Sequence, residues 1–389
     1  MATASDAELE AWLTLILVPG LGPSGIGKLL GRFGGPQAIC DASTTDLRAL
    51  GLKAPMIEAL RRPDARAISA AMSWSQHEDA NILTLDDPRY PPLLGAITPA
   101  PPVLFVRGDV ALLQEPQLAI VGSRNPTPGG VQTTHAFAAH LAALGLVITS
   151  GLASGIDAAA HSGALDRGRT IAVLGTGPNR VYPAANRDLA RRIAVEGALV
   201  SEFPPGVGPH ASHFPRRNRT ISGLSLGVLV TEAAPRSGSL ITARHAAEQG
   251  REVFAIPGSI HNPLARGCHA LIRDGAKLVD GVDQLLEELA PQLRDYLPDA
   301  DLASSPTPPA RRPSVDSSTT LPEAASPGLE LDADYRTLLE CMGQDPVAPD
   351  ELVERSGFTA QEVSSMLLLL ELQGHVSCLP GGRFSRTAC

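Results

Sequence analysis

The residues that follow the apolar run 118–121 have the types and spacing of a phosphate-binding turn. The run is too short for a helix and predicts a buried strand, and Gly122 allows a sharp turn where that strand ends. Thr127 can cap the next helix, so backbone amides and a helix N-terminus point at whatever lies above the strand, which favours a phosphate. Arg124 supplies a planar guanidinium suited to phosphate oxygens. The same residues also fit an ordinary strand–helix turn with a solvated arginine.

Three further segments carry residues that favour anions and are expected at the same edge of a sheet. They are Ser150 and Gly151 after a second predicted strand, the basic cluster Arg216, Arg217, Asn218 and Arg219, and the small residues Ser237, Gly238 and Ser239. Small hydroxyl residues and free amides at a helix start suit a phosphate. The basic cluster, with three arginines in four residues, is predicted as a loop that precedes a helix over 221–224. A solvated surface turn is the alternative for this cluster.

Two ionisable residues near these segments favour structural roles. Asp157 follows Ser154 by three residues, a spacing at which the serine caps a helix and the acid reaches back to it. Because an unpaired carboxylate would repel phosphate, Asp157 is predicted to be a helix-cap acid and not a catalytic one. His161, one turn further on, is predicted to be a packed or hydrogen-bonded core residue.

The chain lacks the motifs of common catalytic and cofactor sites. It contains no GxSxG, HExxH or P-loop sequence. Gly175 and Gly177 supply only two of the three glycines of a dinucleotide-binding turn, and Pro183 interrupts the helix that would follow. His210 and His213 have no cysteine or carboxylate beside them to complete a metal site. We therefore expect no catalytic residue, no metal and no cofactor.

Short apolar segments and amphipathic segments alternate from residue 117 to 290. Strands are predicted over 118–121, 146–149, 170–174, 198–201, 227–231, 252–256 and 276–279. Helices are predicted over 128–144, 154–167, 185–196, 238–249 and 267–274. This alternation predicts an α/β fold, a parallel sheet with helices on both faces. Ligands of such sheets bind at the carboxyl ends of the strands, where the four segments are expected to meet.

The segments on either side of this α/β domain, 117–290, differ from it in composition. Residues 1–85 have helical periodicity, and the Gly-x-Gly turn within 19–23 gives a helix-hairpin-helix pattern that an ordinary glycine-rich turn also explains. A proline-rich connector is predicted over 86–116. A proline- and serine-rich linker, expected to be disordered, is predicted over 291–329.

Residues 330–389 are predicted to form three helices and a hairpin, the pattern of a winged helix. Ten acidic residues and four arginines give this segment a net charge of −6. Phosphate binding needs positive charge. The segment is therefore predicted to contact a protein and not DNA.

The composition of the whole chain narrows the class of protein further. The net charge of −9 excludes a polybasic nucleic-acid binder, so any nucleic-acid site must be a local basic patch. Five scattered cysteines without a CxxC pair argue against a disulfide framework or a zinc site. The start of the sequence has no basic region before its first apolar run, and no apolar run is long enough to span a bilayer. We expect a cytoplasmic protein with no membrane contact.

A series of short motifs spans the whole α/β domain in a fixed order. The motifs are Ala119-Ile-Val-Gly-Ser-Arg124, Ser150-Gly-Leu-Ala-Ser-Gly-Ile-Asp157, Ala160-His161, Gly163-Ala-Leu165, Thr170-Ile-Ala-Val-Leu174, Val181-Tyr-Pro183, Ser201-Glu202, Phe214-Pro-Arg-Arg-Asn-Arg219, Ser237-Gly-Ser-Leu240, Gly250-Arg-Glu-Val-Phe-Ala-Ile-Pro-Gly258, Leu271-Ile272 and Gly275-Ala276. In this order they resemble the bacterial DNA-processing protein A family, DprA. The resemblance implies an extended Rossmann-like core, a SAM-like N-terminal helical domain and a C-terminal winged helix.

The resemblance also implies a function and a site. The family's members are non-enzymatic proteins of natural transformation that bind and protect incoming single-stranded DNA, load the RecA recombinase on it and form homodimers. Carried onto this sequence, the DNA pocket comprises Gly122, Ser123, Arg124, Ser150, Gly151, Arg216, Arg217, Asn218 and Arg219, which our reading of the residues extends to Ser237, Gly238 and Ser239. Many relatives have arginine where Ser154 stands, so one DNA contact is expected to be missing here. Leu271 and Ile272 are the residues that we expect at a dimer surface.

Two aspects of this hypothesis need a direct test. Single strands bind partly by stacking on aromatic rings, and the nearest rings are Tyr182, Phe203 and Phe214. The alternative function is a nucleoside-monophosphate phosphoribohydrolase-like enzyme on a related Rossmann-like fold. That family uses a Pro-Gly-Gly-x-Gly-Thr-x-x-Glu loop, and the comparable segment here, 234–242, lacks both the glycine run and the glutamate.

Overall fold

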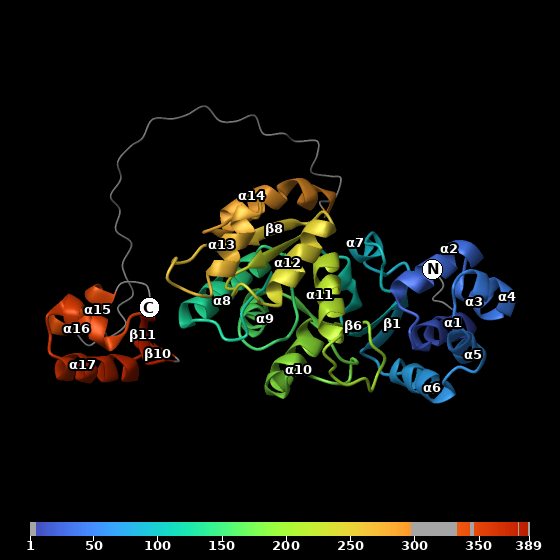
Figure 1. Cartoon of the computed structure of the whole chain (residues 1–389), viewed down its shortest axis with the longest axis horizontal. Helices are drawn as coiled ribbons and strands as arrows, with labels where there is room; N and C mark the ends of the chain where they lie inside the picture. Colours follow the sequence, from blue (N-terminus) through green and yellow to red (C-terminus); the bar gives the residue numbers. More distant parts are fainter. Residues whose placement is uncertain (1–4, 297–332, 343–345, 380, 388–389) are drawn as a thin grey trace, which may run out of the picture. The chain divides into compact units, whose positions relative to one another are not determined.

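The computed structural model describes residues 5–296, 333–342, 346–379 and 381–387 (Figure 1). These residues form two compact units, Met1–Gln292 and Leu293–Cys389, and each is described here by itself. The predicted linker over 291–329 lies outside the described residues from 297 onward. No helix of the described residues has both the length and the apolar character that a bilayer crossing requires.

A nine-stranded sheet forms the centre of the first unit (Figure 1). Its seven parallel strands are β3 Gln117–Val121, β4 Val147–Ser150, β5 Thr170–Leu174, β6 Ala198–Ser201, β7 Gly227–Val230, β8 Glu252–Ala255 and β9 Lys277–Leu278. They lie in the order β6-β5-β4-β3-β7-β8-β9. The parallel α/β sheet predicted from the alternating segments is therefore confirmed.

Two antiparallel strands extend the sheet at the β6 edge. They are β1 Ala80–Thr84 and β2 Val103–Gly108, and β2 pairs with β6. The periodicity predicted only helices up to residue 85, and a connector after it, so β1 was missed. The short helix α7, Pro92–Gly95, also lies in the predicted connector. The strands β1 and β2 join the sheet because their apolar residues pack in two cores, the core of the sheet and the core of the N-terminal helices.

Helices cover both faces of the sheet. They are α8 Pro128–Ala143, α9 Ile156–Arg167, α10 Arg187–Glu196, α11 His213–Leu224, α12 Ser239–Glu248, α13 Arg266–Arg273 and α14 Val282–Leu293. Alternate residues of one strand belong to different cores, as expected when side chains point to opposite faces. On β5, Leu174 packs in a cluster with Ile193 of α10, whereas Val173 packs in a cluster with Ile221 of α11.

The chain reverses its direction of travel across the sheet between β3 and β7. Strands β3 to β6 follow one another toward one edge, and then the chain returns to place β7 on the other side of β3. The loops after these two strands therefore separate to opposite faces and leave a crevice, which is where α/β sheets of this kind bind ligands.

Six helices form the N-terminal part of the first unit. They are α1 Asp6–Leu17, α2 Pro23–Phe33, α3 Pro36–Asp41, α4 Thr44–Ala49, α5 Ala54–Arg61 and α6 Ala65–Trp74. The helix–turn–helix order predicted around the Gly-x-Gly segment is present in α1 and α2. Trp74 meets Phe105 of β2 edge to face at 5.8 Å, so the helices share one core with the antiparallel edge of the sheet.

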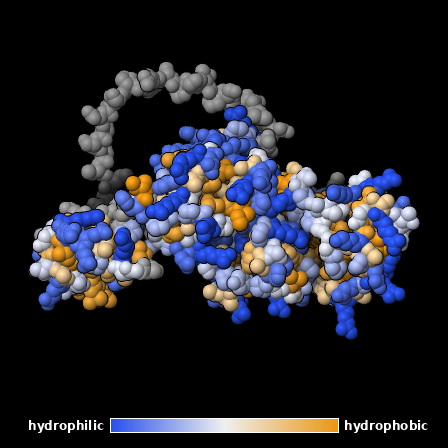
Figure 2. Space-filling view, viewed as in Figure 1, coloured by the Kyte–Doolittle hydropathy of each residue, from blue (hydrophilic) through white to orange (hydrophobic). Residues whose placement is uncertain are grey.

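From residue 333 onward, the described residues of the second unit form three helices and a hairpin, the pattern predicted for a winged helix. The helices are α15 Ala333–Met342, α16 Pro349–Ser356 and α17 Ala360–Leu372, and the strands are β10 Val376–Leu379 and β11 Arg383–Arg386. Thr359 and Glu362 form the predicted capping box at the start of α17. Leu368, Leu369 and Leu372 of this helix are exposed, and Figure 2 shows apolar side chains along that edge of the domain.

Candidate functional site

A hollow of about 550 Å³ lies at the crevice between the ends of β3 and β7. Of the residues predicted to bind phosphate, it brings together Gly122, Ser123, Arg124, Arg217, Asn218, Ser237, Gly238 and Ser239. These come from three separate segments of the sequence, 122–124, 217–218 and 237–239. Arg236 also lines the hollow, so three arginines face one concave surface. We call this hollow the switch-point pocket.

The basic cluster is not a loop, as the sequence analysis predicted, because α11 begins at His213 and contains all of it. A helix turns about 100° per residue, so adjacent side chains diverge. Arg217 and Asn218 line the switch-point pocket. Arg216 instead donates to Glu202 at 2.5 Å, and Arg219 donates to the carbonyl oxygen of Pro99. Pro215, the third residue of α11, led to the prediction of a loop, although proline is tolerated in the first turn of a helix.

Arg217 and Asp157 form a buried ion pair at the base of the switch-point pocket. Nη1 of Arg217 lies 3.8 Å from Oδ2 of Asp157, and the two side chains are 7% and 8% exposed. Burial raises the pKa of Asp157 and lowers the pKa of Arg217. In each residue the charge of the partner has a smaller effect in the opposite direction. Asp157 is the only acidic residue among the described residues that line the pocket, and its charge is compensated by Arg217.

Asp157 was predicted to cap the helix α9, but it bonds instead to the loop before that helix. Its Oδ2 accepts from the amides of Gly151 and Ala153, each at 3.2 Å. The residue at the N-cap is Gly155, with no side-chain cap, so the predicted role of Ser154 is wrong. A carboxylate that holds both a loop and a buried arginine positions the arginine for a ligand.

Ser150 and Gly151 support the pocket from below and are not among its lining residues. Ser150 is fully buried, and its hydroxyl donates to the carbonyl of Ile120 at 2.6 Å. A Cβ on Gly151 would lie 1.3 Å from Nη1 of Arg217. Glycine is therefore required at position 151 because the guanidinium packs directly on its backbone.

The N-terminus of α8 already holds an anion, and this anion is a side chain of the protein. Thr127 caps the helix as predicted, accepting from the amide of Gly130 at 3.0 Å. The buried carboxylate of Glu232, at the end of β7, accepts from the Thr127 amide at 2.9 Å and from its hydroxyl at 2.7 Å. No local sequence pattern predicted this pairing, in which Glu232 takes the place at the start of α8 that we expected a phosphate to occupy.

Aromatic rings lie beside the arginines of the pocket. The guanidinium carbons of Arg124 and Arg217 are each 5.8 Å from the centre of the Phe214 ring. The ring of Tyr182 is 5.8 Å from that of Phe214 and is 48% exposed. Phe203, the third ring considered from the sequence, is buried and stacks on His213 at 4.0 Å, so no base can reach it.

His161 is a core residue, as predicted. Its Nδ1 lies 2.7 Å from the hydroxyl of Thr170, and the side chain is fully buried. Burial, with a smaller effect of the nearby Arg217 charge, lowers its pKa to about 3. Within the described ranges no group of three or more histidine, cysteine and acidic side chains is arranged to hold a metal ion.

The sheet order and the crevice define a doubly wound, Rossmann-like α/β protein with a helical domain before it and a winged helix after it. The family model for DNA recombination-mediator protein A matches residues 81–290, that for the DprA winged helix domain matches 322–382, and that for the SMF/DprA SAM domain matches 6–73. The chain belongs to this DprA/Smf family, as its motifs indicated.

Three relatives show the extent of the similarity. Protein Smf of Escherichia coli is 40% identical over 98% of this chain and 97% of its own length. The X-ray structure of DNA processing protein A from Streptococcus pneumoniae superposes with a TM-score of 0.65 at 39% identity, covering 74% of this chain and 99% of that one. DNA processing protein A from Helicobacter pylori, whose structure describes a single-stranded DNA binding mode, gives 0.51 at 30% identity, covering 56% and 98%.

Proposed function

We propose that this protein binds single-stranded DNA in the switch-point pocket by its sugar–phosphate backbone, without reading sequence. The observation that carries the proposal is the convergence of Arg124, Arg217 and Arg236 on one hollow. Guanidinium and backbone amide donors position phosphates and carry no base information. The Helicobacter pylori relative, described by its single-stranded DNA binding, supports DNA as the ligand.

The chemistry of the pocket favours binding over catalysis. Its one lining carboxylate, Asp157, is buried and paired with Arg217, so it is not available as a general base. The remaining polar lining residues are arginines, serines, a threonine and an asparagine. We infer that the protein is not an enzyme and needs no cofactor.

The family membership extends the proposal to a role in the cell. The protein protects incoming single strands during natural transformation and transfers them to RecA, acting as a cytoplasmic homodimer. Leu271 and Ile272 of α13, which are partly buried against the central core, belong to the proposed dimer surface. Sedimentation of the Leu271→Arg variant tests the dimer, and RecA filament growth on single strands coated with a single-strand-binding protein tests the transfer.

A fluorescence titration of labelled oligothymidylate at several salt concentrations tests the binding function. We expect tight binding to single strands, weaker binding to duplex, and a logarithmic salt slope of about −0.7 for each phosphate contacted. Arg124→Ala lowers the affinity and flattens the slope. A preference for duplex, or an Arg124 variant that binds as the wild type does, contradicts the proposal. Release of free base from nucleoside monophosphates would instead favour the phosphoribohydrolase alternative.

A further inference from the structure

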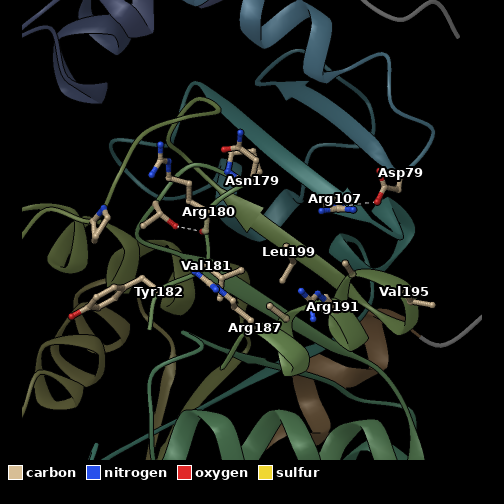
Figure 3. Close-up of a pocket in the computed structure, with 15 residues that line it drawn as sticks. Asp79, Arg107, Asn179, Arg180, Val181, Tyr182, Arg187, Arg191, Val195 and Leu199 are labelled. Atoms are coloured by element: carbon tan, nitrogen blue, oxygen red, sulfur yellow. Dashed lines mark hydrogen bonds and ion pairs between the residues drawn. The ribbon is translucent and has the colours of Figure 1, made fainter. Parts of the chain in front are cut away.

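A second hollow, of about 640 Å³, has no part in the function proposed above (Figure 3). Most of its lining comes from the loop after β5 and from α10, and the rest is Asp79 before β1, Arg107 of β2, Leu199 of β6 and Pro209. Four of the lining residues are arginines, Arg107, Arg180, Arg187 and Arg191, and only Asp79 is acidic. We call this hollow the arginine groove.

Two of these arginines retain uncompensated charge. Asp79 is paired with Arg107 at 2.6 Å, and Arg191 is paired with Asp188 at 2.6 Å. Neither Arg180 nor Arg187 forms an ion pair with a residue that the structure describes, and both are exposed. In a chain of net charge −9, such a pair of free cations in a hollow is a local basic patch of the kind that binds anions.

The loop that presents Arg180 is held in place by the neighbouring loop. The Gly177 amide donates to the carbonyl of Val207 at 2.9 Å, and the Gly206 amide donates to Oδ1 of Asn179 at 2.8 Å. The Thr176 hydroxyl donates to the carbonyl of Arg180 at 2.5 Å. A ligand therefore meets a preformed surface, and ordering this loop costs little on binding.

A smaller hollow shares lining residues with both the arginine groove and the switch-point pocket. A third hollow, of about 100 Å³, is lined by Arg124, Phe214 and Arg217, which also line the switch-point pocket. The same hollow is lined by Tyr182, which also lines the arginine groove. The half-exposed Tyr182 ring therefore stands between the two larger hollows, 5.8 Å from Phe214.

We propose that the arginine groove holds the continuation of the same DNA strand that the switch-point pocket holds. Arg180 and Arg187 bind its phosphates, and an unpaired base stacks on Tyr182 as the strand passes between the hollows. Stacking of a base on an aromatic ring is tolerant of sequence, and a duplex cannot offer its bases in this way. The inference rests on the proposed function and adds a second subsite and a path to it.

The experiment compares two oligothymidylates. One of about 6 nucleotides is short enough to occupy a single subsite, and one of about 24 nucleotides is long enough to occupy both. The groove variant is Arg180→Ala/Arg187→Ala. The matched control is Arg62→Ala/Arg192→Ala, which also removes two positive charges, one of them from α10, at exposed positions outside all three hollows. Affinities are measured by fluorescence anisotropy at several salt concentrations with the full chain.

We expect the groove variant to lose at least about fivefold in affinity for the long oligonucleotide and to reduce its salt slope by about 1.4, or 0.7 for each lost phosphate contact. Its affinity for the short oligonucleotide changes less than about twofold, which also shows that the variant is folded. The control loses less than about twofold with both lengths. Tyr182→Ala is expected to weaken the long complex without changing the salt slope.

Three results would overturn the inference. Equal loss with both lengths would place the two arginines at the first subsite, and no loss with either length would show that DNA does not enter the groove. A groove variant that binds the long oligonucleotide normally but loses affinity for polyglutamate would assign the groove to an acidic protein segment. Failure of the proposed function itself is distinct, because the wild-type protein would then bind neither oligonucleotide.

Discussion

Arg217 and Asp157 lie 3.8 Å apart in the floor of the switch-point pocket, and neither is more than 8% exposed. A cation held below the surface by a buried carboxylate keeps a fixed position with little freedom to follow a ligand. The same carboxylate fixes the loop at Gly151 and Ala153. The pocket therefore has one buried arginine held in place, Arg217, and two exposed arginines, Arg124 and Arg236. Arg124 and Arg217 both lie 5.8 Å from the centre of the Phe214 ring.

Removing one partner of this ion pair is expected to cost more stability than removing both. Arg217→Met leaves Asp157 buried without its counter-charge, which typically destabilises a protein by about 3–5 kcal/mol. The double variant Arg217→Met/Asp157→Asn recovers part of that loss, since no uncompensated charge stays buried. Urea unfolding followed by circular dichroism measures both. A double variant that is less stable than Arg217→Met would show that the pair is not coupled.

Gly151→Ala is expected to weaken DNA binding without changing any charge. The new methyl group would lie 1.3 Å from Nη1 and 2.4 Å from Cζ of Arg217, so the guanidinium must leave Asp157. We expect a loss of about tenfold in single-strand affinity, roughly one good phosphate contact. Gly129→Ala is the control, because a Cβ there meets only the Thr127 hydroxyl at an ordinary 3.8 Å. Equal affinities for the two variants would exclude this role for Arg217.

The buried His161 makes the stability of the first unit depend on pH. Its pKa in the folded protein, about 3, lies below the ordinary value of 6.5 because burial and then Arg217 disfavour the charged form. Between pH 6.5 and 3 the unfolded chain takes up a proton that the folded chain does not, so the free energy of unfolding falls as the pH falls. The slope from this residue approaches about 1.4 kcal/mol per pH unit.

His161→Gln removes this dependence while it keeps a side chain that can bond to Thr170. Urea midpoints measured from pH 7.5 down to 4.5 are expected to fall less steeply in the variant than in the wild type. Parallel pH profiles of the two proteins would show that His161 is not the group responsible.

Glu232 is expected to stabilise the start of α8 through its two bonds to Thr127. Glu232→Ala removes both bonds to a charged acceptor and is expected to lower the free energy of unfolding by about 2 kcal/mol. Glu248→Ala is the control, since that exposed carboxylate forms a surface ion pair with His245, which is worth less than about 1 kcal/mol. Similar urea midpoints for the two variants would contradict a structural role for Glu232.

Deletion of residues 330–389 is expected to leave single-strand affinity within about twofold of the full chain. This segment carries a net charge of −6. Its helix α17 has exposed leucines and contains no basic residue. A domain of that charge repels phosphates and cannot supply much of the binding free energy. A loss of tenfold or more in the same titration would assign DNA contacts to the winged helix.

Much of the fold follows from local patterns, because a strand or helix buried on one face must repeat its apolar residues at a fixed period. This is why the strands β3 to β9 and the caps at Thr127 and Thr359 were predicted correctly. The antiparallel strand β1 was missed, since its five residues have helical sequence before them and a proline-rich segment after them. Helix α11 was placed too late because proline and arginines in its first turn resemble a loop.

The sequence by itself determined that a parallel α/β sheet forms and that anion-binding segments follow its strands. Only the tertiary structure decided which of those residues remain available to a ligand. Arg216 bonds to Glu202, and Arg219 bonds to the carbonyl oxygen of Pro99. The N-terminus of α8 binds the carboxylate of Glu232, a residue 105 positions from Thr127 in the sequence. Such pairings depend on how distant segments pack, and no local periodicity encodes them.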